Sequence, residues 1–314
     1  MSWSADLAAP RPLVPVIVGP TAVGKTAVAL ELRNHWPITV ISADSRQVYR
    51  RLDIGTAKPT LAERKLVRHI GIDVIEPGER YSAGRYASDA AGWMTELPPE
   101  ERPVVVGGTG FYVRALADGL FHEPPMDTHR RELLRNWVGQ RDGLGRWAAR
   151  LDPAFAGGGR QRAARAIEMA LLTGRSLSWW QQEAKAKGVM RPWYVLLTLP
   201  RPILHARIEE RTRWMLKSGL VEEVEGVLSN GVASDAPGLD AVGYREVVQC
   251  LMGDLPEREL ASKIVLSTRR YAKRQETWFR HQLRMAEILT LDSAGTPVDV
   301  AQQITEHWRL RKGS

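Results

Sequence analysis

The stretch VIVGPTAVGKTAVAL, residues 16–30, joins an apolar run to a glycine-containing loop and the start of a helical pattern. In that pattern Val28, Leu32 and Trp36 fall on one face. The order of strand, GxxxxGKT loop and helix is typical of a phosphate site, because backbone amides converge on an anion where the helix begins. The expected diphosphate-binding residues are Gly19, Pro20, Thr21, Ala22, Val23, Gly24, Lys25 and Thr26.

This loop predicts binding of a diphosphate or triphosphate together with Mg²⁺. Its two glycines permit backbone angles that bulkier residues resist. Lys25 adds a positive charge, and the Thr26 hydroxyl is placed to ligate a Mg²⁺ that bridges two phosphates. Nucleotide hydrolysis is less well supported, because VVVGGTG (104–110) ends in glycines and Asp44 is the only good acidic candidate at a strand end.

Five apolar runs, separated by helical patterns, predict the fold class. They are VPVIVG (14–19), ITVISA (38–43), HIGIDVI (69–75), PVVVGGTG (103–110) and WYVLLTLP (193–200). Fully apolar strands that alternate with helices indicate a parallel sheet covered on both faces. We therefore expect an α/β fold, with a P-loop NTPase-like parallel sheet core, helices on both faces of the sheet and a helical insertion domain.

Helical periodicity and charge set the expected domain boundaries. From residue 122 to 191 the chain is helical in pattern and carries 13 Lys/Arg against 7 Asp/Glu. We assign residues 1–121 and 192–314 to the P-loop α/β core with C-terminal helices, and residues 122–191 to the insertion. Further expected core elements are a helix over 82–97, a long helix over 257–288, an edge strand at 288–292 and a last helix to Leu310.

The charge distribution suggests a polyanionic partner. The chain has a formal net charge of +8, and residues 269–284 contain 6 Lys/Arg against one Glu. Arg270, Arg274, Trp278 and His281 recur at intervals of four, four and three, which forms a basic stripe with one aromatic along a helix. Such a stripe suits single-stranded RNA. A solvated basic face with Trp278 in the core explains the same pattern.

The remaining composition excludes several classes of protein. No apolar run approaches the roughly 20 residues that cross a bilayer, and the start MSWSADLAAPRP lacks the order of a secretory signal. We therefore expect a cytoplasmic protein without membrane contact. The single cysteine, Cys250, excludes an internal disulfide and a Cys-based metal cluster, and we expect it to be a buried helical thiol.

Six segments, in order along nearly the whole chain, have a more specific meaning than the loop alone. They are GPTAVGKT (19–26), ISADSRQVYRRLDIGTAKP (41–59), VVVGGTGFYVRAL (104–116), RIEERTRWMLKSGLVEEV (207–224), DAVGYREVVQCL (240–251) and KRQETWFR (273–280). Together they closely resemble bacterial tRNA dimethylallyltransferases, also called tRNA isopentenyltransferases. The resemblance implies transfer of a dimethylallyl group from dimethylallyl diphosphate to N6 of the adenosine at position 37 of tRNA, next to the anticodon, with release of diphosphate.

The resemblance also implies catalytic roles for three residues. Thr109 and Arg211 would join the loop and Mg²⁺ around the leaving diphosphate, where negative charge develops. Asp44 would be the general base, since adenine N6 is a poor nucleophile that must be oriented and deprotonated. Alternatives from the residues alone stay open: Asp44 as a cap of the following helix, and Thr109 as a helix N-cap.

The tRNA contacts are implied by the same segments, on the premise that the target base leaves its stack to reach the donor. The implied tRNA-binding residues are Asp44, Ser45, Arg46 and Gln47 at the lip where the adenine enters, with Thr109, Arg131, Gln161, Arg162, Ala163, Ala164, Arg165, Asp240, Ala241, Val242, Gly243, Tyr244, Arg245, Lys273, Arg274 and Trp278. The chain has Gly158-Gly159-Arg160 where the family pattern has an Asn-Asp pair. No CxxC pair occurs, so no metal other than Mg²⁺ at Thr26 is implied.

Three other functions stay open. An adenylate isopentenyltransferase acts on free adenine nucleotides, which do not need so large a cationic surface. A small-metabolite P-loop kinase explains the loop but neither DAVGYR nor KRQETWFR. A non-catalytic RNA-binding protein does not explain an intact Lys25, Thr26 and Asp44. The partners that we expect are therefore tRNA and dimethylallyl diphosphate, bound by a monomer.

Overall fold

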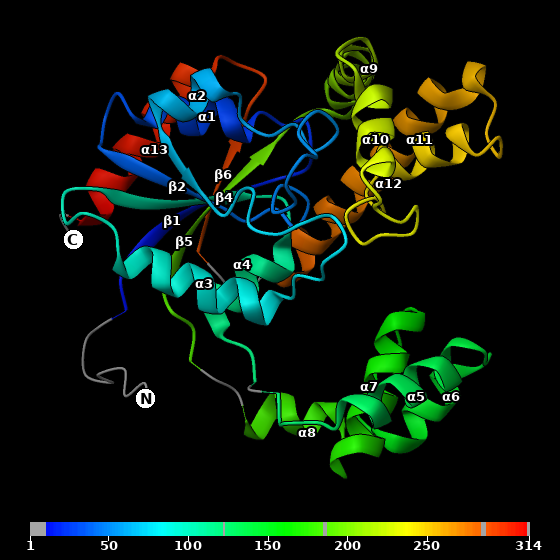
Figure 1. Ribbon diagram of the computed structural model, residues 1–314. Coiled ribbons are helices and arrows are strands. Elements are labelled where there is room, and N and C mark those ends of the chain that lie inside the picture. The colour runs from blue at the N-terminus through cyan, green and yellow to red at the C-terminus, as the bar shows by residue number, and fades with distance from the viewer. Residues whose placement is uncertain (1–10, 122, 185–186, 284–286, 313–314) are drawn as a thin grey trace. The chain divides into compact units, whose positions relative to one another are not determined.

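The computed structural model describes residues 11–121, 123–184, 187–283 and 287–312, and within them six strands form one parallel sheet (Figure 1). The strands lie in the order β3-β2-β4-β1-β5-β6. They are β1 (Leu13–Val18), β2 (Ile38–Ser42), β3 (Arg68–Ile70), β4 (Arg102–Gly107), β5 (Arg191–Thr198) and β6 (Ile288–Asp292). The predicted α/β fold with a parallel sheet core is confirmed.

Helices cover both faces of this sheet, with α1 and α13 on one side and α3 and α4 on the other (Figure 1). Val16, Ile17 and Val195 are fully buried, as expected for strands that have helices on both faces. Outside the helical insertion, the described helices are α1 (Lys25–Leu32), α2 (Leu61–Leu66), α3 (Ala83–Thr95), α4 (Gly110–Asp118), α9 (Arg201–Lys217), α10 (Leu220–Ser229), α11 (Tyr244–Leu251), α12 (Glu257–Gln282) and α13 (Pro297–Lys312).

A second compact unit, residues 118–188, interrupts the unit formed by residues 1–117 and 189–314. It contains α5 (Thr128–Gly139), α6 (Leu144–Leu151), α7 (Arg160–Thr173) and α8 (Leu177–Glu183). Its own apolar core includes Val138, Leu144, Ala148, Ile167 and Met169. The boundaries expected from the sequence were residues 122 and 191, a few positions further along the chain.

Two predicted elements are shorter in the structure. The apolar run at 69–75 forms a strand only to Ile70, because Gly71 and Asp73 adopt positive φ values of 82° and 57° and turn the chain away. The long helix that begins at Glu257 ends at Gln282 rather than near residue 288. In both places the chain continues to be partly apolar, so hydrophobic pattern alone does not mark the end of the element.

Three expectations from composition concern the signal segment, membrane contact and the cysteine. Residues 1–10, most of the stretch without a signal pattern, lie outside the described residues. Over the ranges that the structure describes, no helix has the length and apolar character to cross a bilayer. Cys250 lies on α11 as expected but is only partly buried, so the expectation of a buried thiol was wrong.

The carboxyl ends of β2 and β4 approach each other closely at Ala43 and Gly107. The Ala43 N–H donates to the Val106 carbonyl oxygen at 2.8 Å, and the Thr109 N–H donates to the Ala43 carbonyl oxygen at 3.1 Å. A Cβ on Gly107 would lie 2.1 Å from the Ala43 oxygen, which no side chain tolerates. Glycine at 107 therefore permits the contact that brings the residues after β2 beside those after β4.

We expect Gly107→Ala to lower the free energy of unfolding by about 3 kcal/mol, since the new methyl group forces the two strand ends apart. Gly92→Ala is the matched control, because Gly92 lies within α3 and a Cβ there meets nothing within 4 Å. That control should be neutral or stabilising by up to about 1 kcal/mol. Urea unfolding measures both. Equal stability of the two variants would contradict the strand contact.

Candidate active site

Residues 19–24 connect β1 to α1 through three left-handed backbone positions. The φ values are 153° at Gly19, 64° at Ala22 and 105° at Gly24. A Cβ on Gly19 would lie 2.6 Å from the Leu197 carbonyl oxygen, so only glycine fits at this position. Turns of this kind allow successive loop amides to face one anion at the start of α1.

Lys25 is the first residue of α1, and its side chain folds back over the loop. Its Nζ donates to the carbonyl oxygens of Gly19 and Pro20 at 3.0 and 2.8 Å. Burial lowers the pKa of Lys25 to about 8, although Asp44 opposes this effect, and Arg211 lowers the pKa slightly further. At neutral pH the ammonium is therefore mostly charged, and it is poorly solvated in the absence of an anion.

A cavity brings the loop together with the ends of β2 and β4. It is lined by Lys25, Thr26, Ala29, Val40, Ser42, Asp44, Gln47, Pro59, His69, Val106 and Gly107. Its Thr26 hydroxyl is an oxygen donor of the kind that Mg²⁺ prefers, and the Lys25 ammonium lies beside it, so the residues fit a magnesium-bound anion. Among the described side chains, no group of three or more His, Cys, Asp or Glu could form a metal centre of its own.

Asp44 and Thr109 follow neighbouring strands, and Thr109 bonds to Ser45, the residue after Asp44. Thr109 Oγ1 accepts a hydrogen bond from the Ser45 N–H at 2.9 Å, and its hydroxyl donates to Ser45 Oγ at 3.2 Å. Asp44 Oδ1 accepts from the N–H of Arg46 at 2.9 Å. The next helix after Asp44 begins only at Leu61, so the alternative in which Asp44 caps a following helix was wrong.

Arg211 extends from α9 to the phosphate loop. Its NH1 donates to Thr21 Oγ1 at 3.2 Å. Burial lowers the pKa of Arg211, while Asp44 opposes that effect. Lys25, Arg211 and Asp44 thus form a group of two cations and one carboxylate that influence one another. The surplus of positive charge favours an anion in this place.

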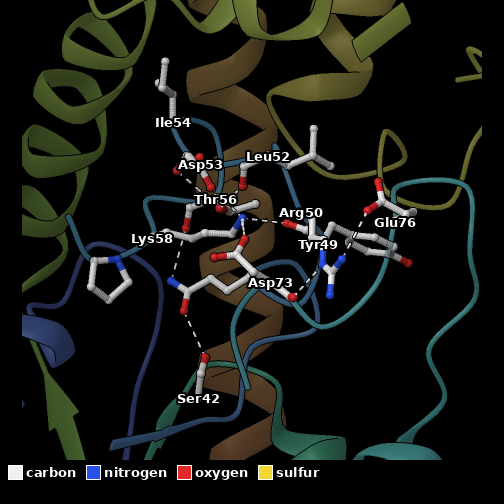
Figure 2. Close-up of polar contacts among 12 residues, drawn as sticks. Ser42, Tyr49, Arg50, Leu52, Asp53, Ile54, Thr56, Lys58, Asp73 and Glu76 are labelled. Carbon is white, nitrogen blue, oxygen red and sulfur yellow. Dashed lines mark hydrogen bonds and ion pairs between the residues drawn. The ribbon is translucent and has the colours of Figure 1, made fainter. Parts of the chain in front are cut away.

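The segment that carries the expected lip residues is held by an ion cluster around the buried Lys58 (Figure 2). Lys58 is 8% exposed, and its Nζ donates to the Tyr49 carbonyl oxygen, Asp53 Oδ1 and Asp73 Oδ1, each at 2.6 Å. Burial alone would raise the pKa of Asp73, but hydrogen bonds from Lys58 and a neighbouring arginine hold it below its usual value. Sequence reasoning missed Lys58, for which the only signal was a lysine inside the quoted GTAKP.

Two of the lip residues use their polar groups within the protein. Gln47 Oε1 accepts from Ser42 Oγ at 2.9 Å, and Gln47 Nε2 donates to the Ala57 carbonyl oxygen at 3.2 Å. Arg46 NH1 donates to the Pro237 carbonyl oxygen at 3.1 Å. These bonds give the lip a fixed shape, so that the Gln47 side chain keeps one orientation at the cavity.

The segment 240–245 is connected through Glu223 to the chain that follows the lip. Tyr244 is fully buried and donates to Glu223 Oε1 at 2.6 Å. The Glu223 carboxylate in turn accepts the backbone N–H groups of Asp53 and Ile54 at 2.7 and 2.9 Å. Among the other residues of the segment, Ala241 and Gly243 are buried, Val242 is half-buried, and Asp240 and Arg245 are exposed. The Tyr244 side chain therefore helps to hold residues 53 and 54 through Glu223, and it forms no surface.

The basic stripe lies on α12, where it borders a hollow of about 680 Å³. The lining residues are Arg270, Lys273, Arg274, Thr277, Trp278, His281 and Gln282. Trp278 also packs over the first residue of α4, since a Cβ on Gly110 would lie 2.2 Å from its ring. Trp278 thus packs against α4 and also lines the hollow.

In the helical unit, Arg131 of α5 and Arg165 of α7 share the same two glutamate partners. They bond to Glu168, Arg131 through Nε at 2.6 Å and Arg165 through NH1 at 2.5 Å, and both also pair with Glu123. The Glu168 side chain is buried, and these hydrogen bonds hold its pKa below the usual value against the effect of burial. Of the adjoining residues, Gln161 and Arg162 are exposed, Ala164 is half-buried and Ala163 is buried.

Comparisons with family models and with known proteins both identify isopentenyl or dimethylallyl transferases as relatives of this chain. The family model described as IPP transferase matches residues 47–282, and the model described as Isopentenyl transferase matches residues 12–76. The tRNA dimethylallyltransferase 1 of Syntrophotalea carbinolica is 41% identical over 296 residues, which cover 91% of this chain and 92% of the relative.

Solved structures of similar proteins share the fold. The tRNA isopentenylpyrophosphate transferase from Bacillus halodurans has a TM-score of 0.71 and 32% identity, with 96% of both chains covered. A eukaryotic dimethylallyltransferase described as acting on tRNA has a TM-score of 0.75, with 96% of this chain and 77% of that chain covered. At 24% identity the second likeness shows the fold alone.

We expect the affinity for inorganic diphosphate to fall as the pH rises above about 8, because the Lys25 ammonium then loses its proton. The measurement is calorimetric titration of wild type and Lys25→Met between pH 7 and pH 10. Dividing one affinity by the other removes the titration of diphosphate itself. A ratio that stays constant across this range would contradict the assignment of the charge at the loop to Lys25.

Proposed function

This chain belongs to the tRNA dimethylallyltransferase family, and we propose that it transfers the dimethylallyl group of dimethylallyl diphosphate to N6 of the adenosine at position 37 of a tRNA. The observation that carries the proposal is the single cavity lined by Lys25, Thr26 and Asp44. There a phosphate-binding loop and a carboxylate meet at the carboxyl ends of a parallel sheet, the edge at which open α/β sheets bind ligands.

In the proposed reaction the loop stabilises the group that leaves. The bond between the allylic carbon and the diphosphate oxygen breaks, and its electron pair remains on the diphosphate. In this proposal Lys25 and Arg211 lie where this negative charge increases, and both are partly shielded from solvent, which strengthens their effect. Mg²⁺, held by the Thr26 hydroxyl, would neutralise part of the diphosphate charge when bound.

Asp44 acts in this proposal on the other reactant. The N6 amine forms a new bond to the allylic carbon, and its proton passes to the Asp44 carboxylate. Because Asp44 Oδ1 accepts the Arg46 N–H at 2.9 Å, the carboxylate has a fixed direction before the substrate arrives. Thr109 is fixed against Ser45 on the adjoining strand end and can contact either the diphosphate or the incoming base.

We propose that exposed and half-buried cations on both units hold the tRNA. The candidates on α12 are Lys273 and Arg274, which line the hollow with Trp278. Those in the helical unit are Arg131, Arg165 and the exposed Arg162, and Arg245 adds a charge beside the lip. The buried Ala163, Ala241 and Tyr244 would support these surfaces from within. The enzyme would act as a cytoplasmic monomer.

We expect purified protein with Mg²⁺ to transfer a labelled dimethylallyl group onto an anticodon stem-loop with adenosine at position 37, and Asp44→Ala to lose at least about 100-fold in turnover. Its affinity for RNA should change little, because Asp44 is assigned to proton removal. Asp254→Ala, an exposed aspartate after α11, is the control. Labelling of AMP but not RNA would favour an adenylate isopentenyltransferase. Phosphate release from ATP would favour a small-metabolite kinase.

We also expect stem-loop binding to weaken steeply with salt, since each phosphate contact releases counterions. The double variant Arg270→Ala, Arg274→Ala should lower the slope of log affinity against log salt by roughly 1–2. Lys263→Ala is the control. It also removes a positive charge from α12, but Lys263 does not line the hollow. An unchanged slope in the double variant would remove α12 from the RNA-binding surface.

A further inference from the structure

The side chain of Gln275, in the C-terminal half of α12, connects two loops of the candidate active site. It is 6% exposed. Its Oε1 accepts the N–H of Thr21, in the phosphate loop, at 2.8 Å, and its Nε2 donates to the carbonyl oxygen of Gly108, after β4, at 3.0 Å. Both ends of one amide are therefore used, one for each loop.

Only an amide of this length satisfies both partners. The Thr21 N–H needs an acceptor and the Gly108 carbonyl needs a donor, and a carboxylate has no N–H to donate. The fit is close, because a Cβ on Gly108 would lie 2.3 Å from Gln275 Nε2. The bond also means that the Thr21 amide is already occupied, so that a bound anion is left to the amides nearer the start of α1.

The same face of α12 contacts each residue of the turn after β4. The Tyr271 hydroxyl hydrogen-bonds the side chain of Thr109, and Trp278 covers Gly110. Residues 271, 275 and 278 are spaced by four and three, so they lie on one side of the helix. The phosphate loop, by contrast, is reached from α12 through Gln275, while Arg211 of α9 bonds the Thr21 hydroxyl.

We propose that Gln275 is a positioning residue for the diphosphate site. It fixes Thr21, and with it the hydroxyl that Arg211 uses, relative to the strand end that carries Thr109. Gln275 touches neither reactant in this account and acts through the two loops. This inference rests on the proposed function for the identity of the diphosphate ligand, but direct binding measurements test it whether or not transfer to tRNA occurs.

The test compares Gln275→Ala with wild type by calorimetric titration of inorganic diphosphate in the presence of Mg²⁺. We expect the affinity to fall at least tenfold, because the Thr21 amide and the Gly108 carbonyl lose their partner and the loop loses its fixed position. Affinity for an anticodon stem-loop should change less than twofold. In transfer assays the KM for dimethylallyl diphosphate should rise more than the KM for RNA.

Gln303→Ala, an exposed glutamine on α13, is the control and should bind diphosphate like wild type. Should Gln275→Ala fail to fold, Gln275→Glu keeps the shape and the acceptor for Thr21 but lacks the donor for Gly108, and it should also bind diphosphate at least tenfold more weakly. Unchanged diphosphate affinity in a folded variant would overturn the proposal. An equal loss of diphosphate and RNA affinity would overturn it too, because that result indicates general loosening.

Discussion

The approach of β4 to β2 at Gly107 and Ala43 is the constraint on which the site depends. Without a side chain at 107 the two strand ends come together, and the backbone bonds between them place Thr109 beside Ser45. Asp44 and the phosphate loop then lie on one cavity. A parallel sheet gathers the carboxyl ends of its strands at one edge in any case. The missing Cβ decides how close the two candidate catalytic segments lie.

The charges at this edge are arranged before any ligand is present. Lys25 and Arg211 both have lowered pKa values because they are buried, and Asp44 opposes the effect on each. The electrostatic attraction between such cations and a diphosphate is stronger than it would be for exposed cations, since water screens it poorly. Asp44 stabilises the cations while the site lacks an anion. In our proposal the diphosphate takes over that role, which leaves the carboxylate to accept a proton from the amine.

How far the sequence could predict this depends on how local each feature is. The GxxxxGKT loop and the apolar strands are patterns of neighbouring residues, and the fold class that they predicted is confirmed. Gln275 and Lys58 were missed because their bonds join segments that only the fold brings together. The early end of β3 was missed because the apolar pattern of residues 69–75 does not reveal the positive φ at Asp73. Motif resemblance named Tyr244 without showing that it faces Glu223 rather than solvent.

The two basic surfaces differ in how their cations are held, and in our proposal this difference shapes how each would bind RNA. In the helical unit a buried Glu168 holds Arg131, Arg135 and Arg165, so their side chains are ordered in advance. A guanidinium has five N–H groups and can keep the glutamate while it binds a phosphate. Ordering of this kind lowers the entropy lost on binding and fixes direction. On α12 the exposed Lys273 and Arg274 line an open hollow, where net charge acts over a longer range. In the proposed complex the helical unit would thus fix the orientation of the RNA, and α12 would attract it.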